Sequence, residues 1–301
     1  MYPDKTQDAY KDFKSGLVAI VGAPNAGKST LLNRLLGQKI SITSKKPQTT
    51  RNRILGIVDR PKAQLVLLDT PGVHRASKPL NVRIVDVALS LLGDVDLVLV
   101  LVDAAAPRTE AETYLIEKIS GQKTKAILAL NKIDLVGKPQ LLGQIAHWSA
   151  AHRFEAVVPI SAIQGTQVET LLEAMVQALP CGPPLYPVGM LTDMPERFIA
   201  GEIIREKAFR LTGQEIPYSV AVTVESFKEG KPVKIEATIH VERQSQKGMV
   251  IGKGGRKLKQ IGEAARAEIE RMLGSQVYLK LFVRVQKNWS KDTKALQRFG
   301  Y

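Results

Sequence analysis

The 301-residue sequence is poor in cysteine and aromatic residues, and it has no long uninterrupted apolar run. Cys181 is its single cysteine, so the chain can form no internal disulfide and holds no cysteine cluster for zinc, which fits a reducing cytosol. No run approaches the roughly 20 apolar residues of a membrane span. Residues 1–16 are polar and lack the apolar h-region of a signal peptide. We therefore expect neither a secreted nor a transmembrane protein.

Positive charge is concentrated at the C-terminal end of the chain. The whole sequence carries 43 Lys and Arg against 29 Asp and Glu, a formal net charge of +14. Residues 1–180 hold +6 and residues 181–242 hold −2, whereas residues 243–301 hold +10, from 14 basic and 4 acidic side chains. Such a basic block usually meets a polyanion, so nucleic acid and an anionic membrane surface are both candidate partners.

Between residues 17 and 179, apolar and β-branched runs alternate with amphipathic stretches. This alternation predicts an α/β fold, a mostly parallel sheet with helices on both faces. Residues 97–102 are apolar at every position, as expected of a central buried strand. The predicted strands are residues 17–21, 54–58, 65–68, 97–102, 126–130 and 156–160.

A proline-rich stretch divides the chain. Residues 180–187 hold four prolines and a glycine, a composition that interrupts helices and strands alike. We place a linker at residues 181–192, after a polar extension (1–15) and a first domain (16–180) and before a second domain (193–301). The second domain is predicted as a smaller α+β module with an amphipathic tail at 289–299. Its expected elements are a helix at 195–211, strands at 219–227 and 233–241, a helix at 256–272 and a strand at 277–285.

A glycine-containing loop follows the first predicted strand and fits the pattern G-x-x-x-x-G-K-[ST], from Gly22 to Ser29. Such glycines let the backbone curl so that its N–H groups point at phosphate oxygens. Lys28 reaches the terminal phosphates, the Ser29 hydroxyl can bind Mg²⁺, and a helix predicted at residues 29–36 adds the positive end of its dipole. The loop therefore predicts a nucleotide site. Its expected contact residues are Asn25, Ala26, Gly27, Lys28, Ser29 and Thr30.

A second motif, Asp69-Thr70-Pro71-Gly72, ends the third predicted strand. Ligands of open α/β sheets gather at the carboxyl ends of the strands. Asp69 is placed to hold Mg²⁺ through water, and the Gly72 backbone can approach a γ-phosphate and move when it leaves. Alone, this pattern is more often a turn, but behind a phosphate loop it predicts part of the same site.

A third motif, Asn131-Lys132-Ile133-Asp134, follows the fifth predicted strand and selects the base. The Asp134 carboxylate can accept hydrogen bonds from N1–H and the exocyclic amine of guanine, whereas adenine would leave it unpaired. Asn131 and the Lys132 stem are expected to brace the loop and the base. Ser161 and Ala162, after the last strand, would supply a backbone contact to the guanine carbonyl. The expected ligand is a guanine nucleotide.

In this order and spacing, the three motifs and the Ser161-Ala162 pair resemble a translation-factor-class GTPase over about residues 16–180. The resemblance implies a switch threonine, and Thr50 matches the family position. It gives catalytic roles to Lys28, Thr50 and Gly72, and it places Mg²⁺ among Ser29, Thr50 and Asp69.

Two further residues bear on hydrolysis. Small signalling GTPases carry a glutamine after the glycine of the second motif, where it orients the attacking water. Val73 stands at that position and cannot do so, so we expect slow intrinsic hydrolysis.

Asn25 matches related GTPases in which that asparagine coordinates K⁺ beside the phosphates, which makes K⁺ a candidate second cation.

The basic C-terminal block contains a G-x-x-G turn between apolar residues and a predicted helix. In a KH domain such a loop clamps about four nucleotides of a single strand along their backbone. The pattern is common by chance. The interpretation therefore rests on its context: apolar residues before the turn, a predicted helix after it, and the positive charge of this part of the chain. The residues expected to contact RNA are Ile251, Gly252, Lys253, Gly254, Gly255, Arg256, Lys257 and Lys259.

Over nearly the whole chain, the sequence resembles the Era family of GTPases. Besides the motifs above, residues 202–207 and 217–220, the Val250-Ile251-Gly252 step and the Gly300-Tyr301 ending carry this resemblance. It implies a type II KH fold, binding to the 3′ end of small-subunit ribosomal RNA, and a role in maturation of the small ribosomal subunit. It also implies a cytoplasmic protein with a peripheral fraction on the cytoplasmic face of the inner membrane. We expect a monomer.

Two other functions are compatible with the residues alone. One is a membrane-associated GTPase switch whose basic module binds anionic lipid, and the other is an RNA-remodelling enzyme driven by nucleotide hydrolysis. The second would need helicase motifs or another catalytic centre, and the sequence shows no cysteine nucleophile outside the linker. The membrane switch and the RNA-binding switch predict different results: only the RNA-binding switch predicts that bound nucleotide changes the affinity for RNA.

Overall fold

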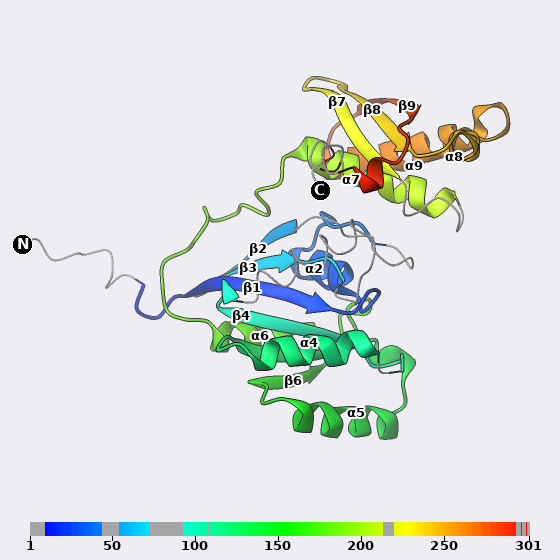
Figure 1. Ribbon diagram of the computed structural model, residues 1–301. Coiled ribbons are helices and arrows are strands. Elements are labelled where there is room, and N and C mark those ends of the chain that lie inside the picture. Colours follow the sequence, from blue (N-terminus) through cyan, green and yellow to red (C-terminus); the bar gives the residue numbers. More distant parts are fainter. Residues whose placement is uncertain are drawn as a thin grey trace, which may run out of the picture. The chain divides into compact units, whose positions relative to one another are not determined.

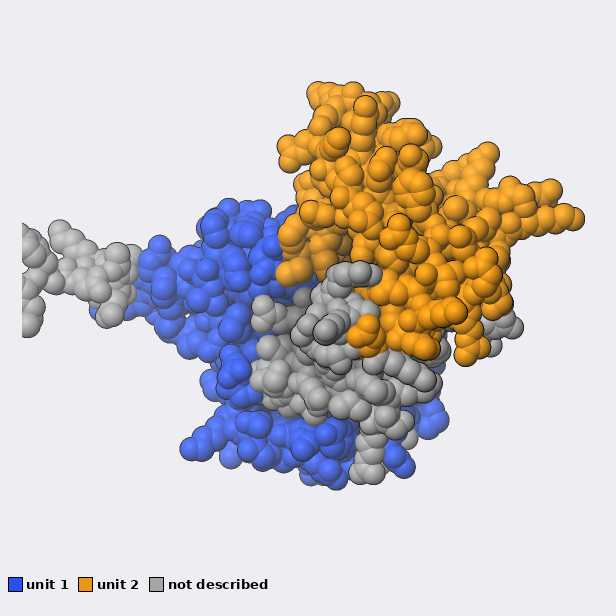
Figure 2. Space-filling view, turned by 45° about the horizontal axis from the view of Figure 1, so that its top comes forward, with its two compact units in different colours: residues 1–38, 50–77, 81–193 blue, residues 39–49, 78–80, 194–301 orange. Residues whose placement is uncertain are grey.

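The computed structural model describes residues 10–43, 54–72, 93–107, 109–212 and 220–292, with residues 296 and 299. These residues form two compact units, drawn in blue and orange in Figure 2. The first unit contains the described residues up to 193 except 39–43. The second contains residues 39–43 and the described residues from 194 onward. Thr50 and Val73, expected at the nucleotide site, lie outside the described residues.

The first unit is built on a six-stranded sheet in the order β2-β3-β1-β4-β5-β6 (Figure 1). Neighbouring strands are parallel except β2 and β3, which are antiparallel. The strands are β1 (Lys14–Gly22), β2 (Ile54–Arg60), β3 (Ala63–Asp69), β4 (Leu97–Asp103), β5 (Lys125–Asn131) and β6 (Ala156–Pro159). Each predicted strand overlaps one of these, and the mostly parallel α/β fold is confirmed.

Helices cover this sheet because successive strand side chains alternate between its faces. Leu115 and Ile119 of α4 and Trp148 of α5 are buried in the apolar cluster on one face. On the other face Gly56 leaves room for Leu32 and Leu36 of α2. The helices of this unit are α2 (Lys28–Leu36), α4 (Glu110–Ser120), η2 (Ile133–Leu135), α5 (Lys138–Ala151) and α6 (Val168–Ala178).

The proline-rich segment lies along the first unit. Gln64, buried in β3, accepts the backbone N–H groups of Leu185 and Tyr186 at 2.7 and 2.8 Å. The Asp59 carboxylate accepts the N–H of Gly189 at 2.7 Å. Because the prolines prevent this segment from forming helix or sheet, its backbone N–H groups need other partners, and these bonds supply them. The segment predicted as a linker is therefore held to the strands β2 and β3.

The second unit is a three-stranded sheet, β7-β8-β9, with helices packed on it (Figure 1). Strands β7 and β8 are antiparallel, and β8 and β9 are parallel. Its elements are α7 (Glu196–Leu211), β7 (Ala221–Lys228), β8 (Val233–Val241), α8 (Gln244–Ile251), η4 (Lys253–Gly255), α9 (Arg256–Leu273), β9 (Val277–Val285) and η5 (Trp289–Lys291). The predicted α+β module is confirmed, and the prediction of β9 matches at both ends.

Helix α8 is an element that the sequence did not predict. Only Gln246 and Val250 of its eight residues are buried, and its middle holds Gly248, a poor helix former. A helix with so little apolar periodicity gives no clear signal in the sequence. It matters because it leads directly into the G-x-x-G turn.

A charged cluster lies between α7, α9 and the segment of residues 39–43. Glu206 is fully buried, and its carboxylate is 2.7 Å from Lys39 Nζ and 2.9 Å from the Arg210 guanidinium. Glu268 pairs with both Lys39 and Lys207. Buried carboxylates are costly unless they are paired in this way.

No helix among the described residues combines the length and apolar content needed to cross a bilayer.

Candidate functional site: a phosphate loop and a G-x-x-G groove

The phosphate loop joins β1 to α2 with a backbone that only particular residues can adopt. Gly27 has φ +104°, and a Cβ there would lie 2.2 Å from Asn131 Nδ2. A Cβ on Gly22 would lie 2.2 Å from the carbonyl oxygen of Leu101. Asn25 has φ +66°, a region that asparagine tolerates better than most residues. Larger residues are therefore excluded at both glycines of the motif, by a backbone carbonyl beside Gly22 and by a side-chain amide beside Gly27.

Lys28 is buried inside this loop. Its Nζ donates hydrogen bonds to the carbonyl oxygens of Gly22 and Ala23, both at 3.0 Å. Burial lowers the pKa of Lys28 to about 8, although the nearby Asp69 carboxylate acts to raise it. Neutral carbonyl groups compensate an ammonium charge poorly compared with an anion. The loop is thus arranged for a negatively charged group near Lys28.

Asp69, at the carboxyl end of β3, lies beside the start of α2. The Ser29 hydroxyl donates to Asp69 Oδ2 at 2.7 Å, and Asp69 is fully buried. The next residue, Thr70, donates from Oγ1 to the carbonyl oxygen of Ile20 at 2.8 Å. A Cβ on Gly72 would lie 2.9 Å from Pro24 Cα. The second motif is therefore packed against the phosphate loop.

Asn131, the last residue of β5, connects three of the predicted motifs. Its Nδ2 donates to the Ala26 carbonyl oxygen at 2.7 Å, and its Oδ1 accepts the Ala162 N–H at 2.9 Å. The side chain is buried. Both ends of one amide thus hold the phosphate loop and the Ser161-Ala162 loop in fixed positions.

The remaining base-site residues surround Asn131. Lys132 has φ +66° and pairs with Asp103 at the carboxyl end of β4. Asp134 is exposed in η2, whereas Ser161 and Ala162 are buried. An exposed carboxylate at this edge is open to a ligand in solvent.

Sequence reasoning missed two residues here, Arg34 and Asp103. Arg34 of α2 donates from Nε to the Ala162 carbonyl oxygen at 3.1 Å and also bonds the Ile163 carbonyl oxygen. Nothing in the local sequence of α2 marks this contact. Asp103 did carry a signal, because it ends a buried strand as Asp69 does.

In the second unit, the G-x-x-G turn lies between α8 and α9. Gly252, Gly254 and Gly255 have φ of +71°, +60° and +76°. A Cβ on Gly252 would also lie 2.8 Å from Lys257 Cβ. No atom would meet a Cβ on Gly254 within 4 Å, so its backbone faces open space. The predicted contact residues that are exposed here are Lys253, Gly254, Arg256 and Lys259, while Ile251, Gly252, Gly255 and Lys257 are half-buried.

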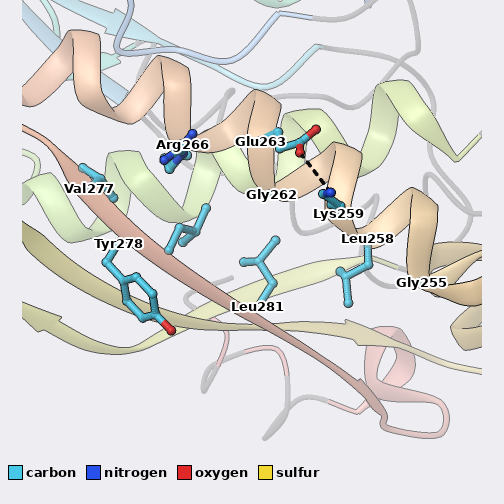
Figure 3. A pocket seen from close by; sticks show the side chains of 10 residues that line it. Gly255, Leu258, Lys259, Gly262, Glu263, Arg266, Val277, Tyr278 and Leu281 are labelled. Atoms are coloured by element: carbon cyan, nitrogen blue, oxygen red, sulfur yellow. Dashed lines mark ion pairs between the residues drawn. The ribbon is translucent and has the colours of Figure 1, made fainter.

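A groove of about 550 Å³ runs from this turn between α9 and β9 (Figure 3). Leu258, Gly262 and Arg266 line it from α9, and Tyr278 and Leu281 line it from β9. Gly262 faces Leu281 Cδ1, 3.6 Å from where a Cβ would be. Sequence reasoning missed this groove because it forms between elements that are separate in the chain. Its walls combine apolar and basic side chains with one carboxylate, Glu263, which pairs with Lys259 at 3.9 Å.

The family comparisons agree with both parts of this arrangement. The model described as 50S ribosome-binding GTPase matches residues 17–132, and the KH domain model matches residues 215–290. Two solved structures are similar over 96% of this chain and 99% of their own, each at 40% identity. One, at a TM-score of 0.92, is an Aquifex aeolicus Era variant bound to GDP.AlF4⁻. The other, at 0.93, is Era with MgGDPNP and nucleotides 1506–1542 of 16S ribosomal RNA.

Curated relatives give the same result. GTPase Era of Geotalea uraniireducens is 55% identical over 97% of this chain and 99% of its own length. GTPase Era of Geobacter metallireducens is 54% identical over 96% and 98%. Fold, site and comparisons define a P-loop GTPase with a C-terminal KH domain. Among such proteins, this chain belongs to the GTPase Era family.

Proposed function

We propose that this GTPase is a guanine-nucleotide switch that binds the 3′ end of small-subunit ribosomal RNA and assists maturation of the small ribosomal subunit. The observation that carries the RNA-binding part is the G-x-x-G turn opening onto the groove between α9 and β9. The similar Era structure with bound 16S ribosomal RNA supports the choice of RNA. This RNA belongs to the small subunit, so the protein would act in the cytoplasm.

In the nucleotide site, Lys28 would neutralise the terminal phosphates, and the N–H groups of residues 25–30 would surround them. Asp134 would accept the two N–H groups of guanine, with Lys132 against the base and the Ala162 backbone at the guanine carbonyl. Asn131 would act indirectly, by fixing both loops through its hydrogen bonds to Ala26 and Ala162. Catalysis would depend on Lys28, Thr50 and the Gly72 backbone.

The residues present fit Mg²⁺. Ser29 Oγ and Asp69 Oδ2 are hard oxygen donors 2.7 Å apart at the start of α2, and such donors suit Mg²⁺. Ser29 and Thr50 would bind the ion, and Asp69 would hold it through water. The ion would supply neutralisation of charge on the phosphates. Mg²⁺ accompanies the nucleotide in the similar RNA-bound Era structure.

Two kinetic properties belong to this proposal. Hydrolysis would be slow, because Val73 cannot orient water. K⁺ would increase the rate, because Asn25 is exposed at φ +66° beside the phosphate loop, where its oxygen could bind a cation. Equal single-turnover rates of GTP hydrolysis in K⁺ and Na⁺ would contradict the prediction that K⁺ activates the enzyme. A fast rate in either salt would remove the slow-switch role.

The experiment that tests the RNA function is a binding series with the full chain. The RNA spans nucleotides 1506–1542 of 16S ribosomal RNA, and the protein carries GDP or a non-hydrolysable GTP analogue. We expect tighter binding with the analogue and a strong salt dependence. Gly254→Asp should weaken RNA binding and leave GTP hydrolysis unchanged. Nucleotide-independent RNA affinity, or loss of hydrolysis in this variant, would contradict the proposal.

Membrane contact is a separate prediction. In the same series, vesicles of neutral and anionic lipid would report any peripheral binding to the basic C-terminal module. Sedimentation with anionic vesicles would support the inner-membrane fraction, and its absence at physiological salt would leave RNA as the polyanion partner.

A further inference from the structure

Two elements of the second unit, α8 and β9, expose large apolar side chains. Among its described residues, the large hydrophobic side chains that are exposed are Met249 on α8 and Tyr278 and Phe282 on β9. Tyr278 is 57% exposed and Phe282 is 43% exposed. Two exposed aromatic rings on one strand favour a binding surface, because large apolar side chains are otherwise mostly buried.

The two aromatic residues belong to one face of β9. The side chains of Val277, Leu279 and Leu281 are less exposed than those of Tyr278 and Phe282, as the alternation of a strand requires. Figure 3 shows Leu281 turned toward α9 and Tyr278 on the opposite side of the strand. The outward row, which we call the β9 row, consists of Tyr278, Lys280, Phe282 and Arg284.

Charge in the β9 row alternates with the aromatic rings. Lys280 Nζ lies 5.0 Å from the centre of the Phe282 ring and 3.7 Å from the carboxylate of Glu236 on β8, an exposed pair that a phosphate could replace. Arg284 is exposed farther along the strand. Basic side chains on an edge strand discourage pairing with other strands. That role explains Lys280 and Arg284, but it gives no reason for exposed aromatic rings between them.

Single-stranded nucleic acid is the ligand that needs both kinds of side chain. Bases stack on aromatic rings irrespective of sequence, while nearby cations neutralise phosphates. Tyr278 and Phe282 are four residues apart, or about 13 Å along an extended strand. That distance exceeds one base step of an extended strand, so the rings would hold separate bases with Lys280 between them.

The β9 row is continuous with the groove. Tyr278 lines the groove and also begins the outward row, so its ring lies where the groove and the row adjoin (Figure 3). A G-x-x-G groove holds only about four nucleotides. The other nucleotides of a longer RNA lie outside this groove, where the adjoining β9 row is available to them.

We propose that the β9 row is a second RNA subsite, on which Tyr278 and Phe282 stack bases outside the groove while Lys280 and Arg284 neutralise the adjoining phosphates. This inference rests on the proposed RNA function and extends it. It predicts that affinity depends on bases that the G-x-x-G turn does not reach.

The test measures the Kd of the full chain, loaded with the GTP analogue, for RNA of nucleotides 1506–1542 of 16S ribosomal RNA. The double variant Tyr278→Leu with Phe282→Leu keeps apolar volume but removes stacking, and it should raise Kd at least about fivefold. The variant Tyr278→Phe with Phe282→Tyr keeps stacking and should stay within about twofold. The slope of affinity against salt should not change, because no charge is lost.

Two controls separate this subsite from other effects. Tyr114→Leu removes a ring of the first unit that also carries a cation, Lys118 at 5.4 Å, and should not change Kd. A second control uses a series of RNAs that each lack one base. At some positions, removal of the base should weaken binding to the unaltered protein but not to the double leucine variant. Such coupling assigns those bases to the two rings.

The outcomes distinguish the subsite from the underlying RNA function. If Gly254→Asp weakens binding but the double leucine variant binds normally, the β9 row is not an RNA subsite and the groove proposal stands. If the unaltered protein does not bind this RNA, both proposals fail. If the leucine variant weakens binding equally at every abasic position, the effect is not stacking and the subsite is rejected.

Discussion

Asn131 Nδ2 donates a hydrogen bond to the backbone carbonyl of Ala26 at 2.7 Å, across 105 residues of sequence. The same amide accepts the Ala162 N–H at 2.9 Å. One side chain therefore determines the distance between the loop for the phosphates and the loop for the base. Replacing it should affect nucleotide binding without any direct contact to nucleotide being lost.

Asn131→Ala should weaken GDP binding by about 10- to 100-fold. The substitution leaves the Ala26 carbonyl and the Ala162 N–H buried without this partner, and each such group costs about 1–3 kcal/mol. Isothermal titration with GDP measures the change. Gln164→Ala, an exposed position in the neighbouring loop, is the matched control and should bind normally. An Asn131→Ala affinity within twofold of the unaltered protein would rule out the bracing role.

Asp134→Asn should change base preference from guanine to xanthine. The new amide would donate to the C2 carbonyl of xanthine, whereas guanine offers an amine there and would meet a second donor. We expect GDP affinity to fall at least about a hundredfold and xanthosine diphosphate to bind better than GDP. Asp134 is exposed, so the thermal midpoint should hardly change. A variant that still prefers GDP would place the base elsewhere.

Lys28 should take up a proton when nucleotide binds. Its pKa is lowered to about 8 by burial in the unliganded protein, and phosphates beside it would raise that pKa again. Near pH 9 the free Lys28 is mostly neutral and the bound one charged. GDP titrations in two buffers of different ionisation enthalpy should therefore show uptake approaching one proton, and affinity should fall as pH rises above 8. At pH 7.5 uptake should be much smaller, because most free Lys28 is already charged. Equal uptake at both pH values would contradict the assignment.

Glu268 should make the stability of the second unit sensitive to acid. Burial acts to raise its pKa, but hydrogen bonds and charges from Lys207 and Lys39 outweigh this and hold the pKa below its usual range. A carboxyl with a depressed folded pKa adds stability above its unfolded pKa, near 4, and loses it as pH falls through the folded value. Urea unfolding from pH 7 to pH 3, followed by Trp289 fluorescence in a Trp148→Phe background, should show this loss.

The matched variant for this experiment is Glu268→Gln, which should be less stable at pH 7 and lose less stability on acidification. Glu236→Gln is the control, because the Glu236 carboxylate forms only an exposed pair with Lys280 at 3.7 Å. Exposed pairs contribute little to stability, so this variant should lose as much stability on acidification as the unaltered protein. An unchanged acid response in Glu268→Gln would show that another group titrates.

The strands and motifs were predictable because their signals are local. Strand β4 is apolar at nearly every position, and Asp69 and Asn131 stand at the ends of such runs, where ligands of α/β sheets gather. The contacts that complete the site are not local. Arg34 meets Ala162 across 128 residues, and Gln64 bonds Tyr186 across 122. No periodicity along the chain encodes such pairs.

The second unit shows the same limit. Strand β9 alternates strictly and was predicted at both ends, whereas α8 has two buried residues and was missed. The groove depends on Gly262 opposite Leu281, a relationship that exists only after α9 and β9 pack together. Its lining could therefore not be predicted from sequence patterns.

Strands β8 and β9 pair in parallel, Val233 with Val277 through Val241 with Val285, and the G-x-x-G turn lies in the crossover between them. A local hairpin cannot make this pairing, because about 40 residues must fold back first. During synthesis, the groove can form only once Leu281, the last of its lining residues, has left the ribosome. A nascent chain that already carries a complete nucleotide site would still be unable to hold RNA in that groove.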